Sequence, residues 1–91
     1  MTWTYSGDPA NSERDEVRFL IQDTDTNDQL LTDAEIEYTL TTAGSVYMAA
    51  HDCAYVIATQ YAQLASSKSV GDMSISYSDR AAGYYTIADR M

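Results

Sequence analysis

The sequence predicts an all-helical protein, a small four-helix bundle with a short β-ribbon or extended loop before its C-terminal helix. Apolar residues recur at three- and four-residue spacing in four segments, as on the buried face of a helix. Residues 68–78 instead alternate apolar and polar side chains, which is typical of a strand. We expect one domain over residues 1–91, made of an N-terminal arm (1–10), a three-helix core (11–66), the extended ribbon (67–78) and a C-terminal helix (79–91).

Size and composition indicate where the stability must come from. A chain of 91 residues buries only about 60–65% of its unfolded surface, so its core is small. Cys53 has no second cysteine with which to form an internal disulfide. With one histidine, the chain also has no cysteine–histidine set for a structural zinc. Helix packing must therefore hold the fold, with contacts between copies as a natural supplement.

The N-terminal arm is expected to be irregular but attached. Trp3 and Tyr5 are two large aromatic residues that would be a liability on a solvated tail, so we expect them to dock on the domain or on a neighbour. The first helix should begin near Asn11 or Ser12, because either side chain can cap the amide groups of the first turn.

The faces of the first helix follow from its spacing. Val17, Leu20 and Ile21 predict an inward stripe, with Phe19 beside it. Arg14 and Arg18, one turn apart, are expected on a more exposed face.

The next two helices have clear boundaries. Thr32 and Glu35 predict a capping box at the start of the second helix, and Gly44 is expected to end it. A third helix over about residues 45–66 is the longest, and it should be the central one because it is apolar on more than one side. Its main stripe consists of Val46, Ala50, Cys53, Ile57, Tyr61 and Leu64.

The extended ribbon lacks an evident partner in the chain. Met73, Ile75 and Tyr77 fall on one side of it. A lone strand leaves its backbone donors and acceptors unpaired, so we expect another copy or another protein to pair with it or cover it. Ser78 or Asp79 should then cap the last helix. The helical stripe of that helix consists of Ala81, Tyr84, Tyr85, Ala88 and Met91.

A possible cation site precedes the second helix. Oxygen-bearing residues there (Asp23, Asp25, Asn27, Asp28 and Asp33) resemble an EF-hand calcium loop in part. The sixth position is an aspartate where the sharp turn needs glycine, and the twelfth position lacks its bidentate carboxylate. Turn formation through side-chain bonds to the backbone is the competing interpretation.

The sequence shows no catalytic machinery. His51, Asp52 and Cys53 are neighbours on the long helix and point about 100° apart, so they cannot form a cysteine–histidine pair among themselves. Cys53 lies on the apolar stripe and is expected to be a core residue, whereas His51 is expected at the surface or at an interface. We therefore expect a protein that is not an enzyme, with no catalytic residues, no metal ligands and no cofactor.

Charge narrows the possible partners. The formal net charge is −9, from 14 acidic and 5 basic residues, and the basic residues are scattered. Tight nucleic-acid binding is therefore not expected. If several copies formed a ring, its acidic lumen would repel the phosphates of DNA and let DNA pass through without binding. The sequence has no membrane-spanning run and no signal peptide pattern, so we expect a soluble protein made inside the cell.

Two motifs suggest a family. Residues 68–77 read Lys-Ser-Val-Gly-Asp-Met-Ser-Ile-Ser-Tyr, and residues 31–36 read Leu-Thr-Asp-Ala-Glu-Ile. With an alanine-rich long helix between them, they make the chain resemble the small head-to-tail adaptor, or connector, proteins of long-tailed bacteriophages. The likeness covers residues 15–91, and the first motif is its most specific part.

The resemblance implies a structural neck protein of the virion, made in the host cytoplasm. Such adaptors form a ring of about twelve copies that docks on the portal, joins head to tail and receives a stopper or other completion protein, while DNA passes through the lumen. The implied contacts with sibling subunits or neck proteins are Lys68, Val70, Gly71, Asp72, Met73, Ile75 and Tyr77. The implied portal contacts are Tyr84, Tyr85, Ile87, Arg90 and Met91.

Two other classes of function stay open at this point. A calcium- or metal-binding helical module would require the loop over residues 23–33 to bind ions. A small acidic inhibitor directed at a host protein would rest on the net charge alone.

Overall fold

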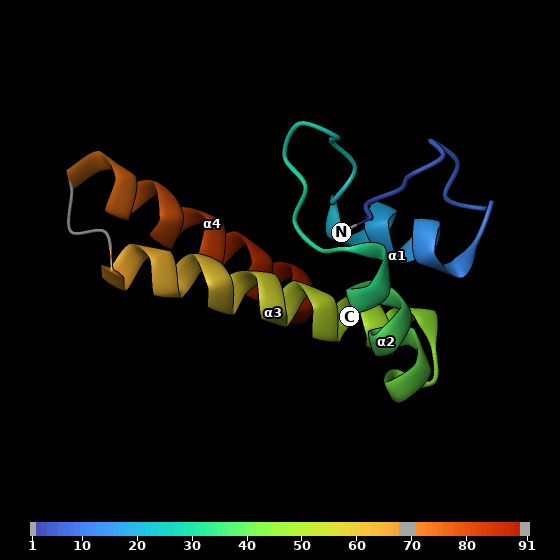
Figure 1. The fold of residues 1–91 in the computed structure, drawn as a ribbon. Coiled ribbons are helices and arrows are strands. Elements are labelled where there is room, and N and C mark those ends of the chain that lie inside the picture. Colours follow the sequence, from blue (N-terminus) through green and yellow to red (C-terminus); the bar gives the residue numbers. More distant parts are fainter. Residues whose placement is uncertain (1, 68–70, 90–91) are drawn as a thin grey trace.

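Four helices make up the regular structure of the described chain. The computed structural model describes the backbone of residues 2–67 and 71–89 and the side chains of residues 2–65 and 77–89. The helices are α1 (Glu13–Ile21), α2 (Asp33–Ala43), α3 (Val46–Ser67) and α4 (Gly71–Asp89). Helices α3 and α4 lie side by side as a long hairpin, α1 and α2 pack on α3, and the N-terminal arm lies beside α1 (Figure 1). The predicted small all-helical bundle is confirmed.

Helix α3 is the centre of the fold, as its pattern predicts. It contacts each of the other three helices, and its 22 residues give the molecule a long axis of 40 Å. Its apolar side chains repeat at three and four residues on two adjoining faces, so one face receives α1 and α2 while the other receives α4. Its fully or nearly fully buried residues are Ala49, Ala50, Cys53, Ala54, Ile57, Ala58 and Tyr61.

The predicted helix boundaries are confirmed for α1 and α2. Ser12 caps α1, because its hydroxyl accepts a hydrogen bond from the amide of Asp15 at 3.1 Å. Thr32 accepts from the amide of Glu35 at 3.2 Å, and the Glu35 carboxylate accepts from the amide of Thr32 at 2.8 Å. Gly44 ends α2 with φ of 83°, a conformation that favours glycine. Local sequence therefore fixes these ends.

Replacing Thr32 with alanine is expected to destabilise the protein by about 1 kcal/mol, because α2 loses one side-chain acceptor for its first turn. Chemical denaturation followed by circular dichroism measures this loss. Thr41→Ala is the matched control, since Thr41 is exposed near the other end of α2 and its hydroxyl bonds the carbonyl of Glu37. Equal effects of the two changes would show that the capping box adds nothing specific.

The predicted ribbon over residues 67–78 is wrong where the structure describes the chain, and residues 68–70 lie outside the described part. Residues 71–78 are the first two turns of α4, and Ser78 and Asp79 lie inside that helix instead of capping it. A helix pairs its backbone groups within the segment, which removes the unpaired edge that a lone strand would have had. Tyr77 also belongs to a helical stripe with Ala81, Tyr84 and Ala88, and this stripe faces α3. The argument that the segment needs an external strand partner therefore no longer holds.

The N-terminal arm docks on its own domain. The carbonyl of Thr2 accepts from the amide of Asp33 at 2.8 Å, and the amide of Thr4 donates to the Asp33 carboxylate at 2.9 Å. The indole nitrogen of Trp3 donates to Asp23 at 3.0 Å. These bonds hold the arm against the start of α2 and the loop before it. Docking on the domain was one of the two predicted positions for Trp3.

Arg18 is buried, so its predicted position on an exposed face is wrong. Its side chain is 0% exposed and forms ion pairs with Asp23 and with Asp33, the latter at 2.8 Å. It also donates to the carbonyl of Thr4 at 2.8 Å, and its guanidinium carbon lies 4.7 Å from the centre of the Trp3 ring. We call these five residues the Arg18 cluster. It joins the arm, α1, the α1–α2 loop and α2.

Arg14, one turn before Arg18, is closer to the predicted position. Its side chain is partly exposed, and it lies 3.5 Å from the carboxylate of Glu37 and 3.7 Å from that of Asp33. The two arginines of α1 therefore play different parts. Arg18 completes the buried junction, whereas Arg14 rests at its edge.

Candidate functional site

Large apolar side chains that remain exposed mark the candidate site as an interaction surface. Apart from Phe19, all of those found among the described side chains belong to α2, α3 or α4. Tyrosine suits surfaces that are half apolar and half wet, and it is enriched at protein interfaces. The exposed set on these three helices is Tyr38, Tyr47, Met48, Tyr55, Val56 and Tyr85.

Three tyrosines of the α3–α4 hairpin pack within the chain instead. The ring of Tyr61 stacks on Tyr77 and on Tyr84, with centroid distances of 6.2 and 6.0 Å. Arg80 covers the same ring, its guanidinium carbon 5.5 Å from the centroid and its Nη1 atom 3.4 Å from the Tyr61 hydroxyl. We call these four residues the Tyr61 stack. It fastens α4 to α3.

Some side chains of the predicted portal contacts pack against the core of the protein, and one is exposed. Burial raises the pKa of Tyr84 to about 12, and Ile87 is partly buried against the core, so both side chains help to attach α4. Tyr85 instead lies on the outer side, 36% exposed, with its ring 5.5 Å from that of Tyr55 and nearly perpendicular to it. Arg90 and Met91 lie outside the described residues.

The predicted subunit or neck-protein contacts lie mostly where side chains are not described. Tyr77 is half-buried in the Tyr61 stack. The backbones of Gly71, Asp72, Met73 and Ile75 belong to the first turns of α4, and their side chains fall outside the description. Lys68 and Val70 lie outside the described residues altogether.

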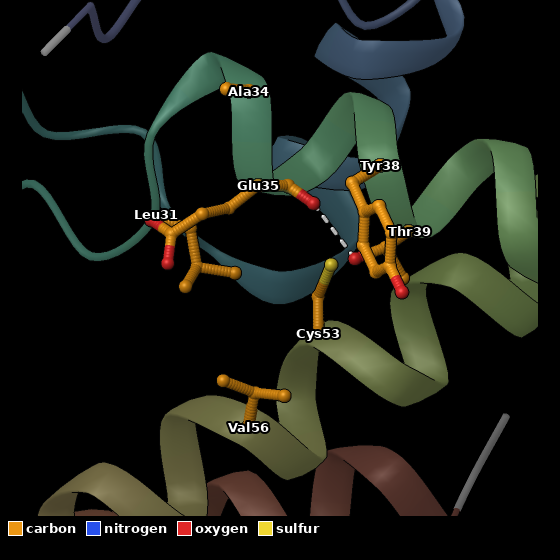
Figure 2. Close-up of a pocket in the computed structure, with 7 residues that line it drawn as sticks. All are labelled: Leu31, Ala34, Glu35, Tyr38, Thr39, Cys53 and Val56. Atoms are coloured by element: carbon orange, nitrogen blue, oxygen red, sulfur yellow. Dashed lines mark hydrogen bonds between the residues drawn. The ribbon is translucent and has the colours of Figure 1, made fainter.

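A groove with a mainly apolar lining lies between α2 and α3. Its volume is about 350 Å³. Figure 2 shows Tyr38 and Val56 on its two sides, with the sulfur of Cys53 pointing from α3 towards α2 between them. The residues that line what we call the α2–α3 groove are Leu31, Ala34, Glu35, Tyr38, Thr39, Cys53 and Val56. The sequence analysis missed this groove, although Tyr38 and Val56 are apolar residues beside the helical stripes.

A second hollow of about 430 Å³ lies along the α3–α4 hairpin. Small side chains and the ring of Tyr85 line it. Its lining residues are Ala62, Ala65, Ser78, Ala81, Ala82 and Tyr85.

The structure separates the three polar neighbours of α3. The Nδ1 atom of His51 lies 3.1 Å from a carboxylate oxygen of Asp52, and both side chains are partly exposed. Cys53 is 1% exposed, and burial raises its pKa to about 11, so the thiol is protonated at neutral pH. Cys53 is therefore a core residue, as predicted. Among the described residues, no group of three or more potential ligands is placed to hold a metal ion.

The acidic loop before α2 is organised by its own backbone. Asp23 is 0% exposed, and its two oxygens accept from Trp3, Arg18 and the amides of Leu30 and Leu31. Asp25 accepts from the amide of Asn27 at 2.9 Å, as in a turn. The oxygens that would begin a calcium loop thus already have partners, which favours the turn interpretation.

The fold should weaken in acid because of Asp33. Burial acts to raise its pKa, but bonds from Arg18 and Thr4 and the charge of Arg14 outweigh burial and lower it below the ordinary 3.8. A carboxyl with a depressed folded pKa adds stability above its unfolded pKa and loses it as pH falls through the folded value. We expect a constant urea midpoint between about pH 7 and 5 and a decline below about pH 4.

Asp33→Asn tests the origin of that decline. The variant should be less stable than the wild type at neutral pH, and the difference should shrink as the pH falls below about 4. Asp25→Asn is the control, because Asp25 is exposed in the loop turn. A difference between wild type and D33N that stays constant with pH would contradict the assignment.

Comparison with protein-family models, with curated proteins and with solved structures finds no match. In the part of the chain that the structure describes, no helix is long and apolar enough to cross a membrane.

Proposed function

We propose that this chain is a structural component of a phage neck, a head-to-tail adaptor that forms a ring of about twelve copies on the portal, with DNA passing through the lumen. The sequence resemblance over residues 15–91 suggests this role. The observation that carries it is the set of exposed tyrosines on α2, α3 and α4, of which Tyr55 and Tyr85 form a pair. Such a surface serves binding to other proteins.

The shape of the molecule supports an assembly role. The α3–α4 hairpin extends beyond the cluster formed by the arm, α1 and α2 (Figure 1), and Tyr55 and Tyr85 form an exposed aromatic pair on it. An exposed edge-to-face pair offers a partner a large and ordered apolar area at low entropic cost. On this proposal, Tyr85 is the described portal contact, whereas Tyr84 and Ile87 support it from inside.

The charge supports passage of DNA without binding. The net charge is −9, and carboxylates are exposed at Asp8, Glu13, Asp25, Asp28, Glu37, Asp79 and Asp89. A ring would concentrate this charge around the channel and repel the phosphate backbone. The proposed adaptor would thus guide DNA while its aromatic residues hold its neighbours.

Binding to the cognate portal ring tests the proposal. Purified protein mixed with portal rings should co-sediment with them and appear as an added ring by electron microscopy. Tyr85→Ser should weaken this binding about tenfold or more, as expected for an aromatic hot spot. Thr86→Ser is the control, because Thr86 is exposed beside Tyr85 on α4. No binding of the wild-type protein to its portal would overturn the adaptor function.

A further inference from the structure

The α2–α3 groove has a floor and walls that suit apolar side chains. Leu31 and Cys53 lie deep in it, and Tyr38 and Val56 flank it with 71% and 44% of their surfaces exposed (Figure 2). A volume of about 350 Å³ lies within the range of pockets that bind ligands, about 300–1,000 Å³. An amphipathic helix places such side chains on one face, at positions i, i+3, i+4 and i+7.

The surroundings of the groove are negative. Glu35 is exposed and lines it. Asp52 precedes Val56 by one helical turn, which places it on the same face of α3, with its side chain 48% exposed. Burial is the main cause of the raised pKa of the Cys53 thiol, and the charges of Asp52, Asp23 and Glu35 also raise it. Arg18 neutralises Asp23, so Glu35 and Asp52 are the charges that an occupant meets.

We propose that the α2–α3 groove binds an amphipathic helix of a different protein, one whose apolar face is flanked by lysine or arginine residues. The apolar side chains fill the space between Tyr38 and Val56. The basic residues lie against Glu35 and Asp52. The binding mode is that of a helix in a groove, with the charges selecting the partner.

A second copy of this chain is a poor occupant. The groove needs cations beside Glu35 and Asp52, and the described part of a second copy has no arginine free to supply them. The arginines of the described residues are engaged within the chain. Arg14 pairs with Glu37, Arg18 with Asp23 and Asp33, and Arg80 with Tyr61. The groove therefore favours a partner that supplies positive charge, whether or not the chain is a neck protein.

Two synthetic peptides test this proposal on the full-length protein. Both have about 16 residues and the same stripe of leucine and phenylalanine, but one carries lysine and arginine on its polar face and the other carries glutamate. Fluorescence anisotropy should show the basic peptide binding at least about tenfold more tightly at about 0.05 M salt, with a smaller difference at about 0.5 M. Amide resonances of Ala34, Thr39 and Cys53 should shift on binding.

Variants locate the binding. Tyr38→Ala and Val56→Ser should each weaken binding of the basic peptide about fivefold or more, because both side chains are exposed walls of the groove. Asp52→Asn should reduce the preference for the basic peptide. Tyr47→Ala is the control, since Tyr47 is an exposed tyrosine of α3 that does not line the groove. It should leave the affinity within about twofold.

Several results would overturn the proposal. The first is that the basic peptide does not bind, and the second is that both peptides bind with equal affinity. The third such result is binding of the basic peptide that neither Tyr38→Ala nor Val56→Ser weakens. Self-association in analytical ultracentrifugation that Val56→Ser abolishes would assign the groove to a second copy instead. The portal assay does not involve these peptides, so failure of the neck function and failure of this inference are distinguishable.

Discussion

Replacing Arg18 with alanine is expected to cause the largest loss of stability of any charge change in the protein. The substitution leaves the carboxylate of Asp23 buried without its cation and removes the anchor of Asp33 and of the Thr4 carbonyl. Breaking a buried ion pair from one side costs about 3–5 kcal/mol. The total free energy of unfolding of a small domain is only about 5–15 kcal/mol. Urea denaturation followed by circular dichroism should show a much lower midpoint or an unfolded protein.

Arg14→Ala is the matched control for this prediction. Arg14 lies one turn away on α1, and both of its ion pairs, with Glu37 at 3.5 Å and with Asp33 at 3.7 Å, are long and partly exposed, so its loss should cost less than about 1 kcal/mol. Trp3 is the one tryptophan in the chain, and it contacts Arg18, so its fluorescence reports on the docking of the arm. An Arg18→Ala protein with wild-type stability and wild-type tryptophan emission would show that the Arg18 cluster does not organise the fold.

The sequence could not place Arg18 because what buries it is irregular. Periodicity correctly identifies the inward face of α1, where Val17 and Ile21 are fully buried. The neighbouring face, however, is covered by the arm and by the loop before α2, whose paths no helical period predicts. One signal was nevertheless present in the sequence, because Trp3 needed a docking site. The helix caps could be predicted because a capping box depends only on residues three apart in the sequence.

The error at the start of α4 has a different cause. The seven alternating residues 72–78 are compatible with a strand, but a short apolar pattern does not distinguish strand from helix. Tyr77, Ala81, Tyr84 and Ala88 follow the three- and four-residue spacing of a helix, and this stripe packs against α3. The available clue was α3, because a long helix that is apolar on two sides needs a second helix to cover its second side. Tertiary packing decided the conformation where local preference was weak.

The candidate interaction surface was predictable in kind but not in position. The chain has eight tyrosines against one phenylalanine, a composition that favours some tyrosines at interfaces. The structure leaves Tyr38, Tyr47 and Tyr55 exposed but buries Tyr61. Because a tyrosine side chain is compatible with either place, only the arrangement of the helices separates the two groups. The α2–α3 groove likewise depends on how far apart two helices lie.

Replacing Tyr61 with alanine is expected to detach much of α4 from α3. Tyr61 is 8% exposed, and its ring is the common partner of Tyr77, Tyr84 and Arg80. Removing a large buried aromatic side chain costs about 3–5 kcal/mol. Because α4 packs along α3, amide hydrogens of α4 should exchange with solvent much earlier than those of α1 and α2. Hydrogen exchange with mass spectrometry measures this order.

Two variants separate the ring of Tyr61 from its hydroxyl and from surface effects. Tyr61→Phe keeps the stack and loses only the hydrogen bond from Arg80 to the Tyr61 hydroxyl, so it should cost less than about 1 kcal/mol. Tyr47→Ala removes an exposed tyrosine from the same helix and should have a similarly small effect. If Tyr61→Ala exposed all four helices to exchange together, α4 would be part of one cooperative unit with the rest. If it exposed α4 first, α4 would unfold separately from the rest, and the Tyr61 stack would be what holds it on α3. A partner that binds Tyr55 and Tyr85 together would then stabilise the attachment of α4.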